Sequence, residues 1–248
     1  MSELTWLQWA LLMLGATGIG LSKSGLAGVS LVHVLVFAFV FGARASTGIL
    51  LPLLIVGDLC AVKLVGQGVV WAYVRRLLPP ALVGVVAGWW LLDHLDEAAF
   101  RPIIGSIILV LSLVQWFRMR RPDLFGNVPH ARWFVIGMGM LAGLTTMLAN
   151  AAGPVVALYL LASALPKAPL IATAAWFFLI LNVSKVPLSM NLGLIDAETL
   201  GVNLLLSPCV LVGLYAGRWI VHRIPQRLFD SLLLLFSGVA ALRLIGVI

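Results

Sequence analysis

Long apolar segments alternate with short polar turns along almost the whole chain. Most of these segments approach the roughly 17 to 25 residues that a helix needs to cross a bilayer. Inside lipid the backbone must satisfy its own hydrogen bonds, so such segments are predicted to be helices. Ten segments are recognised, at about 4–20, 25–42, 45–66, 79–93, 102–117, 133–149, 152–165, 170–189, 200–217 and 228–247. The pattern predicts an all-α, polytopic membrane protein with about eight to ten hydrophobic helical segments.

Two places in this pattern suggest helices that break or re-enter the membrane. The segments at 133–149 and 152–165 are short and are joined by a polar, small-residue break, and 4–20 and 25–42 are joined in the same way. A helix over 152–165 covers only about 21 Å at 1.5 Å per residue, less than the roughly 30 Å hydrocarbon core. The sequence leaves open whether these two hairpins span the membrane.

The two halves of the chain resemble each other. GATGIGLSKSG at 15–25 and GLTTMLANAAG at 143–153 both place glycines around a polar break. A long segment with a polar residue inside it follows in each half, Asp58 in the first and Asn182 in the second. Because each half holds an odd number of segments, the copies are predicted to point opposite ways, as inverted repeats of transporters do. The predicted repeats, within one integral membrane domain, are residues 1–125 and 126–248.

Composition supports a membrane protein and excludes several other classes. Of 248 residues, 62% are hydrophobic and only 10% are charged. The mean hydropathy is +1.12, which is too apolar for a water-soluble surface. The net charge of +7 comes from Lys and Arg at segment ends, where such residues set orientation, so no nucleic-acid binding is expected. Cys60 and Cys209 lie inside apolar runs, and no disulfide is expected.

Loop charges predict the orientation of the chain. Four loops carry most of the basic residues and are expected to be cytoplasmic: those with Arg75 and Arg76, with Arg118 to Arg132, with Lys167, and with Arg218 to Arg227. The opposite loops are mainly acidic. If successive segments cross the membrane in alternate directions from these loops, both termini lie in the periplasm. Arg44, which falls in a loop predicted to be periplasmic, is the one clear exception to the charge pattern. The first segment lacks the basic start of a signal peptide and is expected to be retained.

Ionisable residues inside apolar segments are costly and are therefore candidates for function. Asp58 lies deep in its segment, and Lys185 in the matching segment is its expected partner, as a structural ion pair or as part of a substrate site. His33 is either a neutral core histidine or a group that handles protons or binds a ligand. Lys63 lies near a segment end, from which its side chain can reach the lipid headgroups.

The two breaks suit an anion. An interrupted helix exposes unpaired N–H groups at the start of its next piece, and the helix dipole adds positive potential there. In the first break, Lys23 supplies a charge, and hydroxyl and backbone donors come from Ser22, Ser24 and Gly25. In the second, Asn150 supplies an amide and Gly153 close backbone approach, and hydroxyls come from Thr145 and Thr146. The alternative is two tight loops between packed helices, with Lys23 a plain cytoplasmic turn residue.

Several stretches together resemble one family. They are GATGIGLSKSGLAG, AGLTTMLANAAGP, PLLIVGDLCAV, WAYVRRLLPPALVGVVAG, IIGSIILVLSLVQ and FFLILNVSKVPLSMNLGLI. In order and spacing the chain resembles the sulfite exporter TauE/SafE family, also called the 4-toluene sulfonate uptake permease family, over nearly its whole length. It departs from the family where Ser22, Lys23 and Ser24 replace a run of glycines. The resemblance implies a bacterial inner-membrane transporter of sulfur-containing anions such as sulfite, sulfonates, sulfoacetate or thiosulfate.

Together with this resemblance, which implies the sulfur-containing substrate, the sequence predicts a secondary transporter that exports a small anion of this kind, with its site at the membrane midplane between the two repeats. The predicted substrate-binding residues are Lys23, Ser24, Gly25, Asn150, Gly153, Asn182 and Lys185, with Asp58 and His33 as proton-coupling or ion-pairing groups. The alternatives are an importer of the same ligands or of a short carboxylate, and a passive anion channel. No catalytic constellation, metal site or cofactor is expected. The expected partners are the anion and the bilayer, and a homodimer is left open.

Overall fold

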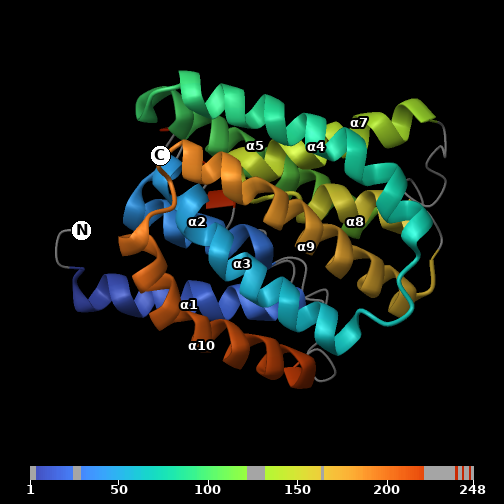
Figure 1. Ribbon diagram of the computed structural model, residues 1–248, viewed down its shortest axis with the longest axis horizontal. Helices are drawn as coiled ribbons and strands as arrows, with labels where there is room; N and C mark the ends of the chain where they lie inside the picture. Colours follow the sequence, from blue (N-terminus) through green and yellow to red (C-terminus); the bar gives the residue numbers. More distant parts are fainter. Residues whose placement is uncertain are drawn as a thin grey trace.

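The described part of the protein is entirely α-helical. The computed structural model describes residues 4–24, 29–121, 132–162 and 165–220, together with the single positions 238, 239, 242 and 246. Within these ranges there are nine helices (Figure 1): α1 (Trp6–Lys23), α2 (Ser30–Phe41), α3 (Ala43–Val65), α4 (Trp71–His94), α5 (Glu97–Arg120), α7 (Arg132–Ala149), α8 (Gly153–Ala162), α9 (Lys167–Asn191) and α10 (Ala197–Ile220). The predicted all-α class is confirmed for this part of the chain.

Six helices of the described chain are long and apolar enough to cross a membrane. They are α3, α4, α5, α7, α9 and α10. By contrast, α2 has 12 residues and α8 has 10, so at 1.5 Å per residue they cover about 18 and 15 Å, well short of a bilayer core. One predicted boundary is wrong, because the helix expected to start at residue 79 starts at Trp71 and carries Arg75 and Arg76 in its first turns. The last predicted segment, 228–247, lies almost entirely outside the described residues.

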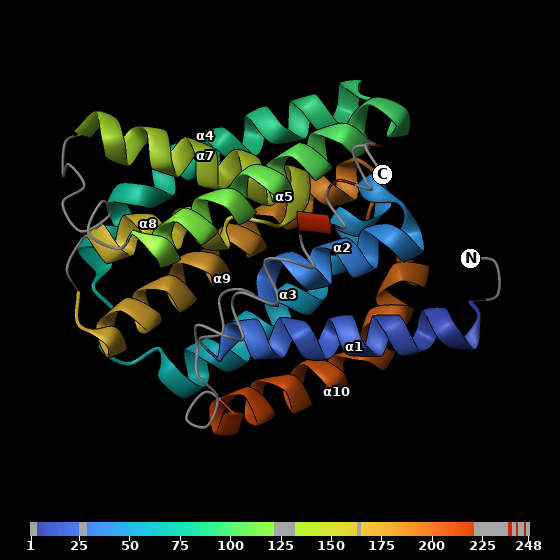
Figure 2. The same cartoon turned by 180° about the vertical axis from the view of Figure 1, so that it is seen from behind.

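Each short helix folds back along the helix before it. In Figure 2, α1 runs from right to left and α2 returns to the right, whereas α7 runs from left to right and α8 returns to the left. The two hairpins therefore enter the helix bundle from opposite sides. Between the two hairpins, α3 and α9 contact each other. In the first hairpin α1 ends at Lys23 and α2 begins at Ser30, and in the second α7 ends at Ala149 and α8 begins at Gly153, close to the predicted breaks.

Polar side chains mark where several helices begin. Thr5, Asp96 and Asp196 each accept a hydrogen bond from the backbone N–H three residues further on, at 3.3, 2.8 and 2.8 Å, as N-cap residues do. The N–H of Thr199 also lowers the pKa of the exposed Asp196 carboxyl. The helices capped in this way, α1, α5 and α10, all begin on the right in Figure 2.

Glu97 of α5 holds the start of α3. Its carboxylate accepts hydrogen bonds from the backbone N–H groups of Ala43, at 2.7 Å, and Arg44, at 3.2 Å. The chain turns sharply at Gly42, whose φ of 86° favours glycine. The Arg44 guanidinium donates to the Leu95 carbonyl at 3.4 Å. Arg44, the exception in the loop-charge pattern, thus lies beside Glu97, which caps the start of α3, the helix that carries Arg44.

Glycines interlock α1 with α10. A Cβ on Gly20 would collide with the Val210 carbonyl, and a Cβ on Gly213 would collide with that of Thr17. Neither position has room for a methyl group. Such close approach of backbones is the usual way in which helices pack inside a membrane, where lipid offers no hydrophobic drive for association.

The same construction joins α4 to α7. A Cβ on Gly143 would collide with the Ala81 carbonyl, and a Cβ on Gly84 would collide with that of Met140. In both helix pairs, then, one glycine from each helix meets a backbone carbonyl of the other. The first helix of each hairpin is fixed in this way to a long helix of the other half of the chain.

Gly143→Ala is expected to destabilise the protein because its methyl group meets a backbone carbonyl rather than a movable side chain. Overpacking of this kind costs about 1 to 3 kcal/mol. Gly137→Ala, on the exposed face of the same helix with nothing within 4 Å of the added carbon, is the matched control and is expected to be neutral or slightly stabilising. Thermal unfolding of the detergent-solubilised variants measures the difference, and equal melting temperatures would contradict the close packing.

Candidate functional site

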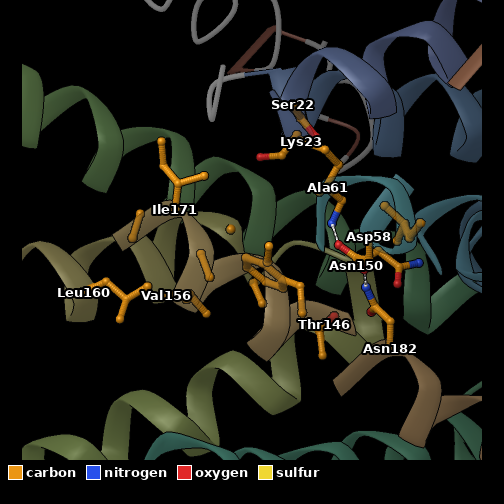
Figure 3. Close-up of a pocket in the computed structure, with 18 of the residues that line it drawn as sticks. Ser22, Lys23, Asp58, Ala61, Thr146, Asn150, Val156, Leu160, Ile171 and Asn182 are labelled. Carbon is orange, nitrogen blue, oxygen red and sulfur yellow. Dashed lines mark hydrogen bonds and ion pairs between the residues drawn. The ribbon is translucent and has the colours of Figure 1, made fainter. Parts of the chain in front are cut away.

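A cavity of about 200 Å³ lies where the two hairpins meet α3 and α9 (Figure 3). Its polar lining residues are Ser22, Lys23, Ser30, His33, Asp58, Thr146, Asn150 and Asn182. The ends of α1 and α7 supply residues from the two hairpins, while α3 and α9 supply Asp58 and Asn182. The cavity thus brings together most of the polar residues that the sequence placed in a substrate site.

Lys23 and Asp58 form a buried ion pair. Lys23 Nζ lies 2.6 Å from Asp58 Oδ1, with the Asp58 side chain fully buried and that of Lys23 14% exposed. The other carboxylate oxygen of Asp58 accepts a hydrogen bond from Asn182 Nδ2 at 2.7 Å. Gly57 leaves room for the lysine, since a Cβ there would lie 3.3 Å from Lys23 Cγ. The ammonium also lies 4.9 Å from the centre of the Phe178 ring, within range of a cation–π interaction.

The predicted pairing of Asp58 with Lys185 is wrong. The lysine beside Asp58 is Lys23, which the end of α1 brings against α3. Lys185 reaches Asp58 only through Asn182, which donates to the carboxylate and accepts from the lysine at 3.3 Å. The prediction assumed that residues in matching segments face each other, but the side chain of Lys185 points towards α7.

Lys185 is surrounded by neutral acceptors. Its Nζ donates to the carbonyl and hydroxyl oxygens of Thr146, at 2.9 and 3.1 Å, and to Asn150 Oδ1 at 2.6 Å, besides Asn182 Oδ1. The side chain is only 1% exposed and does not line the cavity itself. No carboxylate of the described chain forms an ion pair with it. Carbonyl oxygens can only accept hydrogen bonds, so these partners suit a protonated amine with three N–H donors.

Asn150 fixes the break between α7 and α8. Its φ of 50° is the left-handed conformation, which asparagine tolerates better than most residues. Its side-chain amide donates to the Thr47 carbonyl of α3 at 2.9 Å, and its oxygen accepts from Lys185. A continuous polar chain therefore runs from Lys23 through Asp58, Asn182 and Lys185 to Asn150.

The remaining predicted residues divide into two groups. Gly153 lines the cavity at the start of α8. Ser24 does not line it, because its hydroxyl donates to the Leu21 carbonyl at 2.8 Å and packs against Gly217 of α10. Ser22, one residue before the lysine, is in the lining instead. Gly25 lies outside the described residues.

His33 and Lys63 have contrasting surroundings. His33 of α2 is 1% exposed and borders the cavity. Its Nδ1 has no hydrogen-bond partner within the described part of the protein. Lys63, by contrast, is exposed in the last turn of α3, as expected for a side chain that reaches beyond the apolar core.

Two contributors are absent from the predicted site residues: Thr146, whose hydroxyl the sequence places in the second break, and Phe178, which the sequence does not single out. Thr146, which bonds Lys185, lies one helical turn before Asn150, and Phe178, which contacts the Lys23 ammonium, lies one turn before Asn182. Residues four apart share a helix face. This spacing could have identified both residues once Asn150 and Asn182 were chosen.

Comparison with known proteins agrees with the apolar membrane helices of this structure. Neither the curated proteins nor the solved structures yielded a match. The family model described as sulfite exporter TauE/SafE matches residues 11–244, which is nearly the whole chain. The chain belongs to the TauE/SafE family, a family of membrane transporters rather than enzymes.

Proposed function

We propose that the protein exports a small sulfur-containing anion, such as sulfite, sulfoacetate or another organosulfonate, across the bacterial inner membrane. One observation carries the anion part of this proposal, namely the excess of positive charge in the cluster. Asp58 is the one carboxylate among three charged side chains, and it is paired with Lys23. Among the described residues, Lys185 has neutral acceptors only.

An uncompensated buried cation is costly. Even after relaxation, burial of an ion costs several kcal/mol unless a counter-ion approaches. A bound monoanion, such as hydrogen sulfite or an organosulfonate without a second acidic group, would balance the cluster of two lysines and one aspartate. Lys23 would contact this anion directly, because it is the one Lys or Arg in the cavity lining of the described chain. Lys185 would act on it across Thr146, Asn150 and Asn182.

The arrangement of helices supports two inverted repeats, residues 1–125 and 126–248, with the site between them. The hairpins enter from opposite sides, and the contacts of Gly20 with α10 have their counterpart in those of Gly143 with α4. The glycine contacts thus match Gly20 of the first half with Gly143 of the second. The sequence comparison matched Gly15 with Gly143, so the two correspondences differ by five residues. In such transporters, movement of one repeat against the other exposes the site to each side in turn.

The direction of export rests on the predicted orientation, with both termini in the periplasm. The cavity extends from the polar cluster to Leu160 and Leu170, which lie near the connection between α8 and α9. The loop-charge pattern puts this connection, with Lys167, on the cytoplasmic side. On the opposite side, Phe37 of α2 is fully buried and lies close to Gly15 of α1. This conformation would suit loading of an anion from the cytoplasm.

Flux measurements in proteoliposomes test the proposal. We expect saturable flux of sulfite or an organosulfonate and accelerated exchange when the same anion is present on the other side, as carriers show. Flux without saturation or exchange would indicate a channel, and net accumulation from the periplasmic face alone would indicate an importer. Ligands that bind the folded protein should also raise its melting temperature. A short carboxylate such as lactate serves as the comparison, and no response to any sulfur anion would contradict the proposal.

Proton coupling through Asp58 has its own test. If this carboxylate exchanges a proton during transport, flux should vary with pH in the wild type and lose that dependence in Asp58→Asn. The pH profile of initial flux is the measurement, made at equal amounts of folded protein. The same profile in the variant would assign Asp58 to charge pairing alone.

A further inference from the structure

The two ends of the cavity differ in chemistry. Lys23, His33 and Asp58 gather at one end, and the His33 Nδ1 atom there has no partner in the described structure. The other end is built by α8 and the first half of α9. Its larger side chains are Val156, Leu160, Leu170, Ile171 and Phe178. In Figure 3, Val156, Leu160 and Ile171 lie on the side of the cavity away from Asp58 and Asn182.

The cavity residues of α8, and those of α9 before Asn182, form an apolar wall whose side chains offer no hydrogen-bond donor to an inorganic oxyanion. Every cavity residue of α8, and every one of α9 before Asn182, has an apolar side chain or none. An ion such as sulfite, with oxygen over most of its surface, would use the lysine end and leave this wall facing water. The cavity of about 200 Å³ would also hold roughly seven waters at about 30 Å³ each, far more volume than such a small ion fills.

Among the described residues, the wall comes from the second half of the chain only. From α2, the short helix of the first hairpin, Ser30 and His33 line the cavity, whereas α8 contributes four residues to it, Gly153, Val156, Ala157 and Leu160. Phe178 lies where the two ends meet, with its ring 4.9 Å from Lys23 Nζ. An anion held at Lys23 would therefore place any organic group beside Phe178 and along α8.

We infer that the site selects amphiphilic organic monoanions, with the charged head at Lys23 and an apolar group of about three to six carbons along α8 and α9. This inference rests on the proposed anion transport and narrows its substrate class to organic anions. Burial of apolar groups supplies the selectivity. Each buried methylene is worth about a fourfold gain in affinity, so a five-carbon tail gives a large preference over the headgroup alone.

A series of ligands with one head and growing tails tests this selectivity. Binding of sulfite, methanesulfonate, propanesulfonate and pentanesulfonate to the protein in lipid nanodiscs is measured by calorimetry, with protein-free nanodiscs as the blank and pentanol as the uncharged comparison. We expect affinity to rise about fourfold per methylene and pentanol to bind far more weakly. Equal or tighter binding of sulfite would overturn the inference while leaving anion transport standing. No binding by any of these anions would count against both.

Two variants localise the tail. Ala157→Leu adds a larger side chain to the wall and fills the space that the tail would occupy. It should weaken pentanesulfonate binding at least tenfold while changing methanesulfonate binding less than twofold. Ala87→Leu, on the exposed face of α4, is the matched control and should change neither. Val156→Thr keeps the side-chain volume, so it tests the same wall if the larger variant fails to fold, and it should weaken only the long-tailed anion. An equal loss for both ligands would place the tail elsewhere and overturn the inference.

Discussion

Lys23→Gln is expected to lower the affinity for the transported anion by roughly 100-fold, because a charge-assisted contact is replaced by a neutral amide. Lys23 is the cavity-lining cation of the described chain, and its ammonium is positioned by Asp58 and Phe178. Lys63→Gln is the matched control. It removes the same charge from the exposed last turn of α3 and should leave binding unchanged.

The same substitution is also expected to destabilise the fold, and the two effects can be separated. Without Lys23, the fully buried Asp58 loses its counter-ion, which typically costs about 3 to 5 kcal/mol. In the double variant with Asp58→Asn, both charges are gone, and the melting temperature should largely recover. Anion binding should not recover. Wild-type affinity for the anion in either variant would show that the role of Lys23 is purely structural.

Lys185→Met is expected to abolish the rise in melting temperature that a bound anion produces. The substitution keeps an unbranched side chain but removes the uncompensated charge and leaves the oxygens of Thr146, Asn150 and Asn182 without their common donor. Each buried acceptor left unpaired costs about 1 to 3 kcal/mol. The variant without ligand should therefore also melt earlier.

Lys63→Met serves as the control for this change, since it makes the same replacement at an exposed lysine. The measurement is the melting temperature with and without saturating anion, for both variants and the wild type. If Lys185→Met melts earlier but keeps the full anion-dependent rise, Lys185 only holds the break between α7 and α8 in place. The excess charge would then not be what attracts the anion.

Much of the fold could be predicted from hydrophobic length alone. Each long apolar segment in the described chain is a helix, and both breaks in the hairpins were visible as small polar residues between apolar runs. The start of α4 was missed because two arginines suggested a loop. They are tolerated within the first two turns of Trp71–His94, where long basic side chains reach the membrane surface.

The members of the buried polar cluster could be predicted better than their contacts. Charge inside apolar segments and interrupted helices singled out Lys23, Asp58, Asn150, Asn182 and Lys185 from the sequence alone, and these five residues form one chain of contacts. Which lysine meets Asp58 depends on the rotation of each helix about its axis, which the packing of neighbouring helices sets. The predicted pair relied on symmetry between matching segments, whereas the lysines occupy different positions in the two halves. The apolar wall was not predicted. In a sequence this apolar, residues that line a cavity cannot be told from residues that pack between helices.

The interlocking of α1 with α10 has a consequence for how the chain is made. Gly20 and Gly213 lie near opposite ends of the sequence, so the first hairpin emerges from the ribosome long before its close-packed neighbour exists. Contacts so distant in sequence form late, whereas α4 and α7 can associate once the middle of the chain is inserted. During synthesis Lys23 can already meet Asp58 of the nearby α3. We expect this early ion pair to hold the first hairpin in the membrane until α10 is inserted and packs against α1.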